Sequence, residues 1–349
     1  MFSWEDLLAA LAVVVNGLPQ GLLALSFGFA ALPTAIGFAV GALGALFFSS
    51  VAPVSFQAES IVLAGTIGQN RRERCSIVFY TGLAMAVIGG LGLLEPAVAF
   101  VGPAVENGMM AGVGVILASV AIKMVRSRAV AGWSSLVVAL LIYAYTKDLV
   151  YTIVGSVIVG TIPALFGGHA MEVHKEYERI KRMPLVVSSR VIRGTLAMIC
   201  MQIGGNIAYS GITGKIANAP VNVDHMTLYS GLADAASAFF GGGPVEAIIS
   251  GTGAAPHPMT AAVLMMAIMA VILASGLLPV LGRKVPSESI AGFLFVLGAL
   301  VAFPANIQAA VGANPIVGSV AAVVTAATDP FIGLVAGLAV KLLLSFAGF

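Results

Sequence analysis

Gly231-Leu-Ala-Asp-Ala-Ala-Ser-Ala-Phe239-Phe240, followed by Pro244-Val-Glu246, repeats a pattern found earlier in the chain as Gly41-Ala-Leu-Gly-Ala-Leu-Phe47-Phe48, followed by Pro53-Val-Ser55. In both stretches an apolar segment ends in two phenylalanines, and a proline then opens a second apolar segment. Those second segments, at about 53–68 and 244–256, are too short to cross a bilayer, which takes about 20 apolar residues. Because proline is tolerated in the first turn of a helix, each predicts a half-helix that begins inside a membrane.

The composition of the whole chain is that of a membrane protein. Of its 349 residues, 59% are hydrophobic and 9% are charged, and the mean hydropathy is +1.04, whereas soluble domains carry roughly 25% charged residues. These values predict an all-α polytopic protein of the cell (inner) membrane and exclude a soluble enzyme. The pattern gives fourteen apolar segments, at about 7–25, 30–50, 53–68, 76–94, 108–125, 130–146, 149–167, 191–212, 226–241, 244–256, 258–280, 286–303, 311–327 and 330–347.

The internal resemblance continues in the same order along both halves. Glu106-Asn-Gly-Met-Met-Ala-Gly112 corresponds to Glu288-Ser-Ile-Ala-Gly292, and Thr146-Lys-Asp148 corresponds to Ala327-Thr-Asp329. The chain accordingly divides into a first repeat, a polar linker and a second repeat, at 1–168, 169–190 and 191–349. Each repeat has seven segments, and since seven is odd, the second repeat must be inverted in the membrane. Inverted repeats with interrupted helices are typical of secondary transporters, whose substrates bind near the middle of the bilayer.

Other classes of function lack a signature in this sequence. The net charge is only +2, and the two cysteines, Cys75 and Cys200, do not have the spacing of a metal site. The chain contains no His-Glu-x-x-His pair, no Gly-x-Ser-x-Gly elbow and no phosphate-binding loop. We therefore expect no enzymatic activity, no cofactor and no nucleic-acid partner. The expected partners are a small-molecule substrate, a coupling proton or sodium ion, and the lipid bilayer.

The second broken segment and its surroundings resemble a known family. Gly231-Leu-Ala-Asp234, Phe239-Phe-Gly-Gly-Gly-Pro244-Val-Glu246 and Ser250-Gly-Thr-Gly-Ala254 are similar to helices nine and ten of the nucleobase–cation symporters of the xanthine/uracil and hypoxanthine/guanine permease type. The start of the chain, Leu18-Pro19-Gln20-Gly-Leu-Leu-Ala24 with Leu32-Pro33, looks more like the related sulfate permease family. The resemblance implies a fold of fourteen helices, in which helices one to four and eight to eleven form a core domain and the others form a gate domain. It also implies that half-helices three and ten face each other across the substrate, and it allows a homodimer.

The family's substrate-binding residues match this chain only in part. Where the symporters carry an acidic residue on helix eight, this chain has Met201-Gln202-Ile-Gly204, so Met201 or Gln202 replaces the acid. On helix ten the family acid falls at Ser250, while Glu246 lies four residues earlier. A spacing of four places Glu246 and Ser250 on one face of a helix, so we expect Glu246 to take over the role.

Acidic residues inside a membrane are candidates for function because they cost roughly 2.5–3.5 kcal/mol at a helix centre. Glu246 is expected in the first turn of the second half-helix, where it binds substrate or the coupling ion; the alternative role is a structural cap. Glu59 in the first half-helix is a second candidate for the coupling ion, with pairing to a core group as the alternative. Ser55 aligns with Glu246 between the repeats, and Ser55 and Gln57 are expected to contact substrate.

Amide side chains form the remaining part of the expected site. Gln202 and Asn206 share a helix face and offer both donors and acceptors, which suit the edge of a purine or pyrimidine; helix–helix contact is the alternative. Asn16 and Gln20 repeat this spacing in the first segment. Four further residues are expected to have structural roles. Asp234 is expected to brace the core, Asp148 and Asp329 to cap helices, and His257 to lie in a loop.

These features predict a secondary active transporter. The first hypothesis is proton- or sodium-coupled uptake of a purine or uracil-like nucleobase by an elevator-type movement of core against gate. Neither broken segment contains Lys or Arg, so an oxyanion would depend on helix dipoles alone, which favours a neutral, planar solute. The alternative is an anion transporter resembling the sulfate permeases. A channel or a structural membrane protein is a third class.

The basic residues predict an orientation opposite to that of the family, whose termini lie in the cytoplasm. Cytoplasmic loops carry an excess of Lys and Arg. With the termini outside, Lys147 and Lys215 face outward and Lys341 lies within the last segment. The other basic residues then all face the cytoplasm: Arg71, Arg72, Arg74, Lys123, Arg126, Arg128, Lys175, Arg179, Lys181, Arg182, Arg190, Arg193, Arg283 and Lys284.

Overall fold

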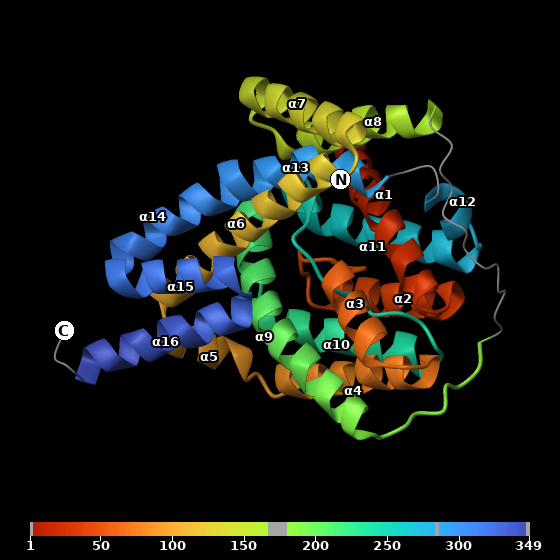
Figure 1. Ribbon diagram of the computed structural model, residues 1–349, viewed down its shortest axis with the longest axis horizontal. Helices are drawn as coiled ribbons and strands as arrows, with labels where there is room; N and C mark the ends of the chain where they lie inside the picture. Colours follow the sequence, from red (N-terminus) through yellow and green to blue (C-terminus); the bar gives the residue numbers. More distant parts are fainter. Residues whose placement is uncertain (1–2, 167–179, 283–285, 347–349) are drawn as a thin grey trace.

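The described part of the chain folds into a bundle of helices around one short pair of strands (Figure 1). The computed structural model describes residues 3–166, 180–282 and 286–346. The first half contains α1 (Trp4–Ser26), α2 (Ala31–Phe47), β1 (Val54–Ser55), α3 (Ala58–Ile67), α4 (Arg71–Gly90), α5 (Leu94–Val101), α6 (Pro103–Ser127), α7 (Ala129–Thr146) and α8 (Leu149–Phe166). The second half contains α9 (Ser189–Ala217), α10 (Val223–Phe239), β2 (Glu246–Ala247), the 3-10 turn η1 (Gly251–Ala254), α11 (Pro258–Ala274), α12 (Leu278–Gly282), the 3-10 turn η2 (Ser287–Ile290), α13 (Ala291–Phe295), the π-helical stretch η3 (Val296–Ala302), α14 (Phe303–Ala313), α15 (Pro315–Ala327) and α16 (Pro330–Phe346).

The fourteen predicted segments all correspond to helical or extended structure. Segment five is preceded by an additional short helix, α5, which follows α4 at a bend of 72°. Segment twelve continues from η2 through α13 and η3 into α14, so it reaches Ala313 rather than residue 303. Within the described residues, five helices are long and apolar enough to cross a membrane, or six if the bent pair α4 and α5 counts as one span.

The two broken segments are present, but their helices begin later than predicted. Pro53 and Pro244 introduce the extended strands β1 and β2 rather than the first turn of a helix. Helix α3 starts only at Ala58, and the second segment forms the single turn η1 before α11. Proline fixes φ near −65°, which suits extended chain as well as a helix, so the prolines alone do not select the conformation. The pairing between the two strands does.

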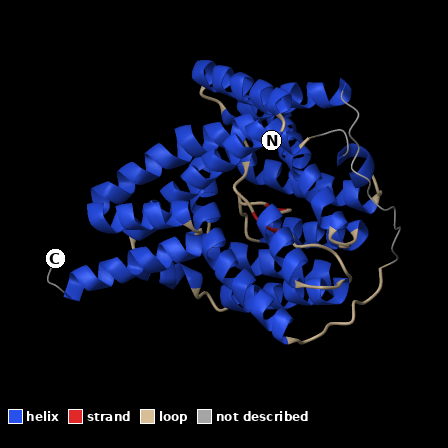
Figure 2. Ribbon diagram, in the orientation of Figure 1, coloured by secondary structure: helices blue, strands red, loops and turns tan. Residues whose placement is uncertain are grey.

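Strands β1 and β2 pair in antiparallel fashion at the centre of the molecule (Figure 2). Val54 lies opposite Ala247, and Ser55 lies opposite Glu246. All four residues are buried, and backbone groups at such depth have no water to bond. The ladder satisfies them and joins the two broken segments. Ser55 and Glu246, which the sequence repeat aligns, are therefore direct neighbours.

Helix packing repeats itself between the two halves, as an inverted repeat requires. Helix α10 packs on α4 as α2 packs on α11, α9 packs on α4 as α1 packs on α11, and α15 packs on α16 as α7 packs on α8. Helices α1–α4 and α9–α11 pack together as the core, and α6–α8 with α13–α16 form the gate. In Figure 1 the core lies to the right and the gate to the left and top, with α9 between them.

Two glycines allow a close contact between helix backbones in the core. A Cβ added to Gly82 of α4 would lie 2.6 Å from the carbonyl oxygen of Gly231 in α10, and a Cβ added to Gly231 would lie 2.5 Å from the carbonyl oxygen of Gly82. Small residues at such crossings bring helix backbones together in membrane proteins. The direction of α10, which ends a few residues before β2, depends on this contact.

Contacts between loops divide the helix ends into two sides. We call one the N-terminal side; it contains the helix ends near residues 3–6, 91–94, 146–149, 218–224 and 254–257. Asp6 is fully buried there, and its carboxylate accepts a hydrogen bond of 2.9 Å from the backbone N–H of His257, whose Nδ1 lies 2.9 Å from the other oxygen. His257 is a loop residue, as predicted. Asp224 accepts a hydrogen bond of 2.7 Å from the backbone N–H of Leu94.

The opposite set of helix ends forms the linker side, near residues 68–71, 127–129, 180–188, 240–243 and 327–330. Arg71 donates to the carbonyl oxygen of Gly241 (3.2 Å), and Ser127 donates to the Glu288 carboxylate (3.1 Å). If the fourteen predicted segments run alternately in opposite directions, the loops fall into the same two groups. The described basic residues that the charge bias assigns to the cytoplasm belong to helix ends on this side: Arg71, Arg72, Arg74, Lys123, Arg126, Arg128, Lys181, Arg182, Arg190 and Arg193. Lys175, Arg179, Arg283 and Lys284 lie outside the described residues.

Candidate functional site

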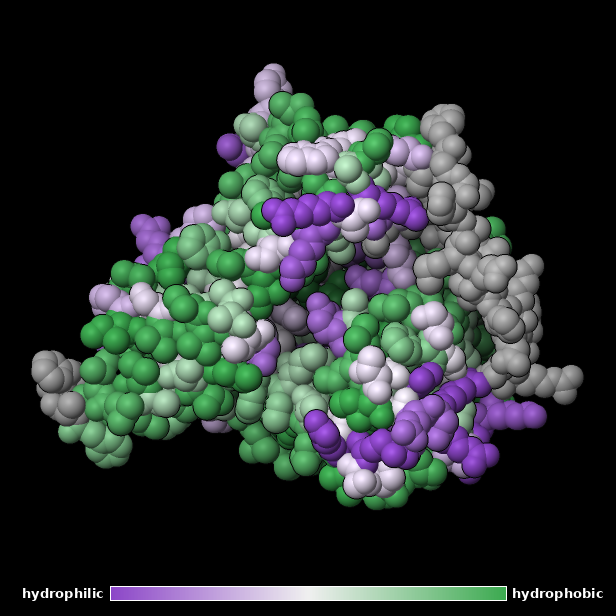
Figure 3. All heavy atoms as spheres, viewed as in Figure 1, coloured by the Kyte–Doolittle hydropathy of each residue, from purple (hydrophilic) through white to green (hydrophobic). Residues whose placement is uncertain are grey.

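A cavity of about 290 Å³ lies between core and gate, and both broken segments contribute to its wall. Figure 3 shows a hollow near the centre of this face, between α3, α6 and α9, with hydrophilic side chains around it. Its rim includes Met124 and Thr328, which belong to helix ends of the linker side, so the cavity opens toward that side. Polar lining residues come mainly from the core: Asn16, Gln20, Ser55, Gln57, Glu59, Gln202, Asn206, Tyr209 and Glu246.

Glu246 occupies the centre of this site, but not in the way that the sequence suggested. It lies in strand β2 rather than in the first turn of a helix, so the position expected for it is wrong, and so is the alternative role as a helix cap. Its side chain is 2% exposed. One carboxylate oxygen, Oε2, accepts a hydrogen bond of 2.6 Å from the Ser60 hydroxyl, whereas Oε1 has no partner among the described residues. An unpartnered buried carboxylate oxygen is costly, and here it belongs to a residue that lines a cavity.

Helix α3 ties Glu246 to the first broken segment. Gln57, its N-cap residue, donates from Nε2 to the carbonyl oxygen of Ala247 (3.1 Å), and Ser60 Oγ lies 3.2 Å from Gln57 Oε1. Ser60 was missed by the sequence reasoning. Its position one residue after Glu59 was the only available signal, because nothing in the sequence shows that α3 turns this hydroxyl toward β2.

The N-terminus of α3 is open toward the cavity. Within the described chain no side chain caps it, and the first turn of any helix leaves backbone N–H groups without helical partners. Gln57, Ala58 and Glu59 all line the cavity. Unpaired N–H groups and the positive end of the helix dipole favour an anion at this point. Glu59 lies in the same turn and is exposed, so its carboxylate stands at the open part of the cavity.

Gln202 and Asn206 both line the cavity from α9, as their spacing predicted. Each is 3% exposed and each also bonds within the core: Gln202 Nε2 donates to Asp234 (2.9 Å), and Asn206 Nδ2 donates to the Thr227 hydroxyl (3.1 Å). The cavity lining supports substrate binding by these two amides, and the hydrogen bonds to Asp234 and Thr227 support a role in helix–helix contact. Asp234 is fully buried and accepts a second hydrogen bond, of 2.6 Å, from the backbone N–H of Val245, which fits the expected brace.

Ser250 is not brought to the cavity. The expectation that it shares a helical face with Glu246 is wrong, because the chain between them is extended and then enters η1. Ser250 is fully buried and its hydroxyl lies 2.7 Å from that of Thr252 and accepts a hydrogen bond from the Thr252 backbone N–H (3.2 Å). It caps the 3-10 turn. Met201, Ser55, Asn16 and Gln20 line the cavity as their positions suggested.

The expected helix caps are confirmed. Asp148 accepts hydrogen bonds from the backbone N–H groups of Val150 (2.7 Å) and Tyr151 (3.1 Å) at the start of α8, and Asp329 accepts one from Ile332 (2.9 Å) at the start of α16. Asp329 also lines the cavity, which the sequence reasoning did not anticipate, and so does Tyr209. Three described lining residues are therefore acidic, Glu59, Glu246 and Asp329, and none is Lys or Arg.

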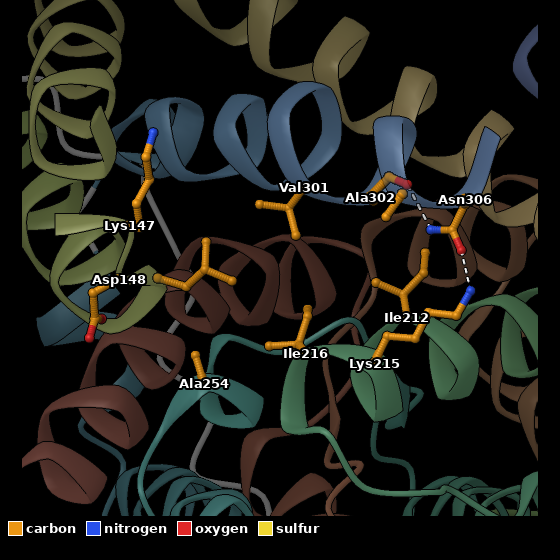
Figure 4. Close-up of a pocket in the computed structure, with 11 residues that line it drawn as sticks. Lys147, Asp148, Ile212, Lys215, Ile216, Ala254, Val301, Ala302 and Asn306 are labelled. Atoms are coloured by element: carbon orange, nitrogen blue, oxygen red, sulfur yellow. Dashed lines mark hydrogen bonds between the residues drawn. The ribbon is translucent and has the colours of Figure 1, made fainter. Parts of the chain in front are cut away.

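A second cavity, of about 390 Å³, lies farther along the same interface (Figure 4). It is lined by Lys147, Asp148, Leu149, Ile212, Lys215, Ile216, Ala254, Val301, Ala302, Ala305 and Asn306, most of which belong to the N-terminal side. On α9, Tyr209 lines the first cavity and Ile212 the second; along the segment from α13 to α14 the corresponding residues are Leu297 and Val301. About one helical turn thus separates the two cavities.

Comparison with known proteins shows which solved structures share this fold. No known family model and no curated protein matches the chain, but solved structures do. The transmembrane domain of the cyanobacterial bicarbonate transporter BicA is matched with a TM-score of 0.60 over 95% of this chain and 96% of that domain, at 16% identity. The chain has the fold of a multi-pass membrane transporter.

Two structures of solute carrier 26 family member A9 match the same fold. The overall structure of SLC26A9 gives a TM-score of 0.65 at 16% identity, over 98% of this chain and 65% of that one. The murine anion transporter Slc26a9 in its inward-facing state gives 0.59 at 14% identity, over 99% and 68%. The chain thus spans about two thirds of the length of these proteins. The resemblance to sulfate permeases agrees with these anion transporters, whereas none of the three supports the nucleobase permease resemblance.

Proposed function

We propose that the chain is a secondary transporter of a small anion, carried by movement of the core against the gate. The cavity between these two bodies is the observation that supports this proposal most directly. Both broken segments line it, and its rim includes helix ends of the linker side. The fold similarity to a bicarbonate transporter and to an anion transporter supports an anion rather than a nucleobase as the substrate.

The anion would bind at the N-terminus of α3. The unpaired N–H groups of its first turn supply a positive field, and the side-chain amides of Gln57 and Asn206 and the hydroxyl of Tyr209 supply further donors along the cavity wall. In our proposal Ser55, Gln202 and Met201 complete the wall. Ser250, which the sequence also suggested, supports the turn behind it.

The three carboxylates make transport of an anion alone unfavourable, because like charges in a buried cavity repel. A cation or a proton that neutralises Glu246 would reduce this repulsion, and the carboxylate oxygen Oε1 of Glu246, which has no partner among the described residues, is available to take one. We therefore propose that Glu246 carries the coupling proton or sodium ion, with Glu59 at the opening as the first residue that the ion meets. Anion and coupling ion would then travel in the same direction.

A nucleobase is the second candidate. The observation in its favour is a wall that contains several amides and, among the described lining residues, no Lys or Arg. A neutral ring would need no compensating positive charge, and amides match its hydrogen-bonding edge.

Uptake into proteoliposomes decides between these substrates. Labelled bicarbonate, sulfate and chloride would be compared with guanine, hypoxanthine, xanthine and uracil, each with an inward sodium gradient, an inward proton gradient or neither. We expect concentrative uptake of at least one anion that requires one of the gradients. Accumulation of a nucleobase without any anion would replace the first proposal by the second, and equilibration of solutes without concentration would indicate a channel.

A further inference from the structure

The second cavity contains a polar contact that connects core and gate. Lys215 belongs to α9 of the core, and its Nζ donates to Oδ1 of Asn107 in α6 and to Oδ1 of Asn306 in α14, at 2.5 Å in each case. Both acceptor helices belong to the gate. Figure 4 shows the Lys215 side chain extending to Asn306 at one end of the cavity.

Both amides are held in the orientation that presents their oxygen. Asn107 Nδ2 donates to the carbonyl oxygen of Pro103, and Asn306 Nδ2 donates to that of Ala302, each at 2.7 Å and each four residues back in its own helix. With one NH₂ hydrogen bonded back to its own helix, each amide presents its carbonyl oxygen to Lys215, and an amide oxygen is a good acceptor for an ammonium group. Two gate helices thus use the same arrangement to receive one cation.

The surroundings of Lys215 strengthen the contact. Asn306 is 2% exposed, so its oxygen has little access to water as a substitute partner. On α6, the carboxylate of Glu106 lies 3.7 Å from the point where a Cβ on Gly211 would stand, one turn before Lys215 on α9. A negative charge beside the ammonium group favours the bound position. Hydrogen bonds that involve a charged partner are stronger than neutral ones.

The position of the contact gives it a consequence for the cycle. It lies on the N-terminal side, whereas the first cavity opens to the linker side. Movement of the core that opened the site to the N-terminal side would have to separate Lys215 from both gate helices. We propose that Lys215, Asn107 and Asn306 form a latch that holds the transporter closed on the N-terminal side. This inference rests on the alternating movement in the proposed function, but not on the identity of the substrate.

Cysteine accessibility measures the latch without any transport assay. Ile249→Cys, which places a thiol in the first cavity, would be introduced into a background without Cys75 and Cys200. Reaction with a membrane-impermeant maleimide would be timed in right-side-out and inside-out vesicles, which gives the ratio of labelling rates from the two sides. Lys215→Met should shift this ratio about tenfold toward the N-terminal side. Tenfold corresponds to about 1.4 kcal/mol.

Two controls make the result specific. Lys147→Met removes a lysine from the same cavity that contacts Tyr143 within the gate rather than the core, and it should leave the ratio within twofold of its original value. Asn306→Ser removes one of the two acceptors and should shift the ratio in the same direction as Lys215→Met, and the two substitutions together should shift it no further than Lys215→Met alone. An unchanged ratio in Lys215→Met, or an equal shift in Lys147→Met, would overturn the latch. Failure of anion uptake with a shifted ratio would leave the latch intact and reject only the proposed substrate.

Discussion

At the scale of single residues, Glu246 is the residue on which coupled transport should depend. Glu246→Gln keeps the acceptor for Ser60 but removes the charge and the site of the coupling ion, so we expect gradient-driven uptake to fall at least a hundredfold. Asp329→Asn is the matched control, because it makes the same change of charge at the same cavity and asparagine caps a helix as well as aspartate. Initial uptake rates in proteoliposomes measure both. Equal losses in the two variants would show that total cavity charge matters rather than Glu246.

Asp234 should matter for stability rather than for coupling. Asp234→Ala leaves the buried donors of Val245 and Gln202 without a partner, and each such donor costs about 1–3 kcal/mol. We expect a clear fall in the thermal unfolding midpoint of the detergent-solubilised protein. Asp234→Asn retains an acceptor, so its unfolding midpoint should fall less. A midpoint in Asp234→Ala equal to that of the unmodified protein would contradict the brace.

The comparison between sequence and structure is also clearest at single residues. Gln202, Asn206, Ser55, Gln57 and Glu59 reach one cavity as predicted, because polar residues in apolar segments of a repeat have few other places to go. Ser250 does not, since the prediction assumed a helix from Pro244 onward. The contacts of Ser60 and Lys215 depend on how separate segments face each other, and no local pattern carries that information.

At the scale of elements, the crossing of α4 and α10 is set by glycine. Gly231→Ala introduces a Cβ into backbone atoms of α4 at 2.5 Å, and overpacking of this kind costs about 1–3 kcal/mol. Gly90→Ala, in the same helix pair, would meet only the Leu228 side chain at 3.7 Å. We expect Gly231→Ala to lower the yield of monodisperse protein and its unfolding midpoint, and Gly90→Ala to change neither. Similar effects of Gly231→Ala and Gly90→Ala would contradict the claim that close packing at Gly231 sets the crossing of α4 and α10.

The broken segments show what a sequence can say about an element. The repeat of paired phenylalanines and proline located both interruptions correctly. Their conformation could not be read from it, because a proline at the start of a helix and one before a strand have the same φ. The strand pair forms between segments from opposite halves of the chain, and only the inverted arrangement brings them together.

At the scale of the whole molecule, the membrane orientation is open to a direct test. The basic residues of the linker side predict that this side faces the cytoplasm. Ser188 caps α9 through Val191, so its exposed neighbour is the better reporter. Ser189→Cys, in a background without Cys75 and Cys200, should resist an impermeant maleimide in intact cells and react after permeabilisation. Pro220→Cys, on the N-terminal side, should react in intact cells. The reverse pattern would place both termini in the cytoplasm, as in the resembling family.

The pairing of Ser55 with Glu246 has a mechanical consequence. The hydrogen bonds between β1 and β2 join the two broken segments into one rigid body. The binding site should therefore change its surroundings during the transport cycle without changing its own shape. Opposed residues in an antiparallel pair have Cα atoms about 4.5–5.5 Å apart, within the range of a disulfide. Oxidation of Val54→Cys with Ala247→Cys should therefore leave uptake largely intact. A reducible bifunctional thiol reagent that spans the length of the Lys215 side chain, and so joins Asn107→Cys to Lys215→Cys, should stop uptake until a reductant is added. Uptake measured before and after crosslinking shows whether the strand pair stays intact throughout the transport cycle. Loss of uptake on crosslinking the two strands would mean that they must separate for the substrate to be released.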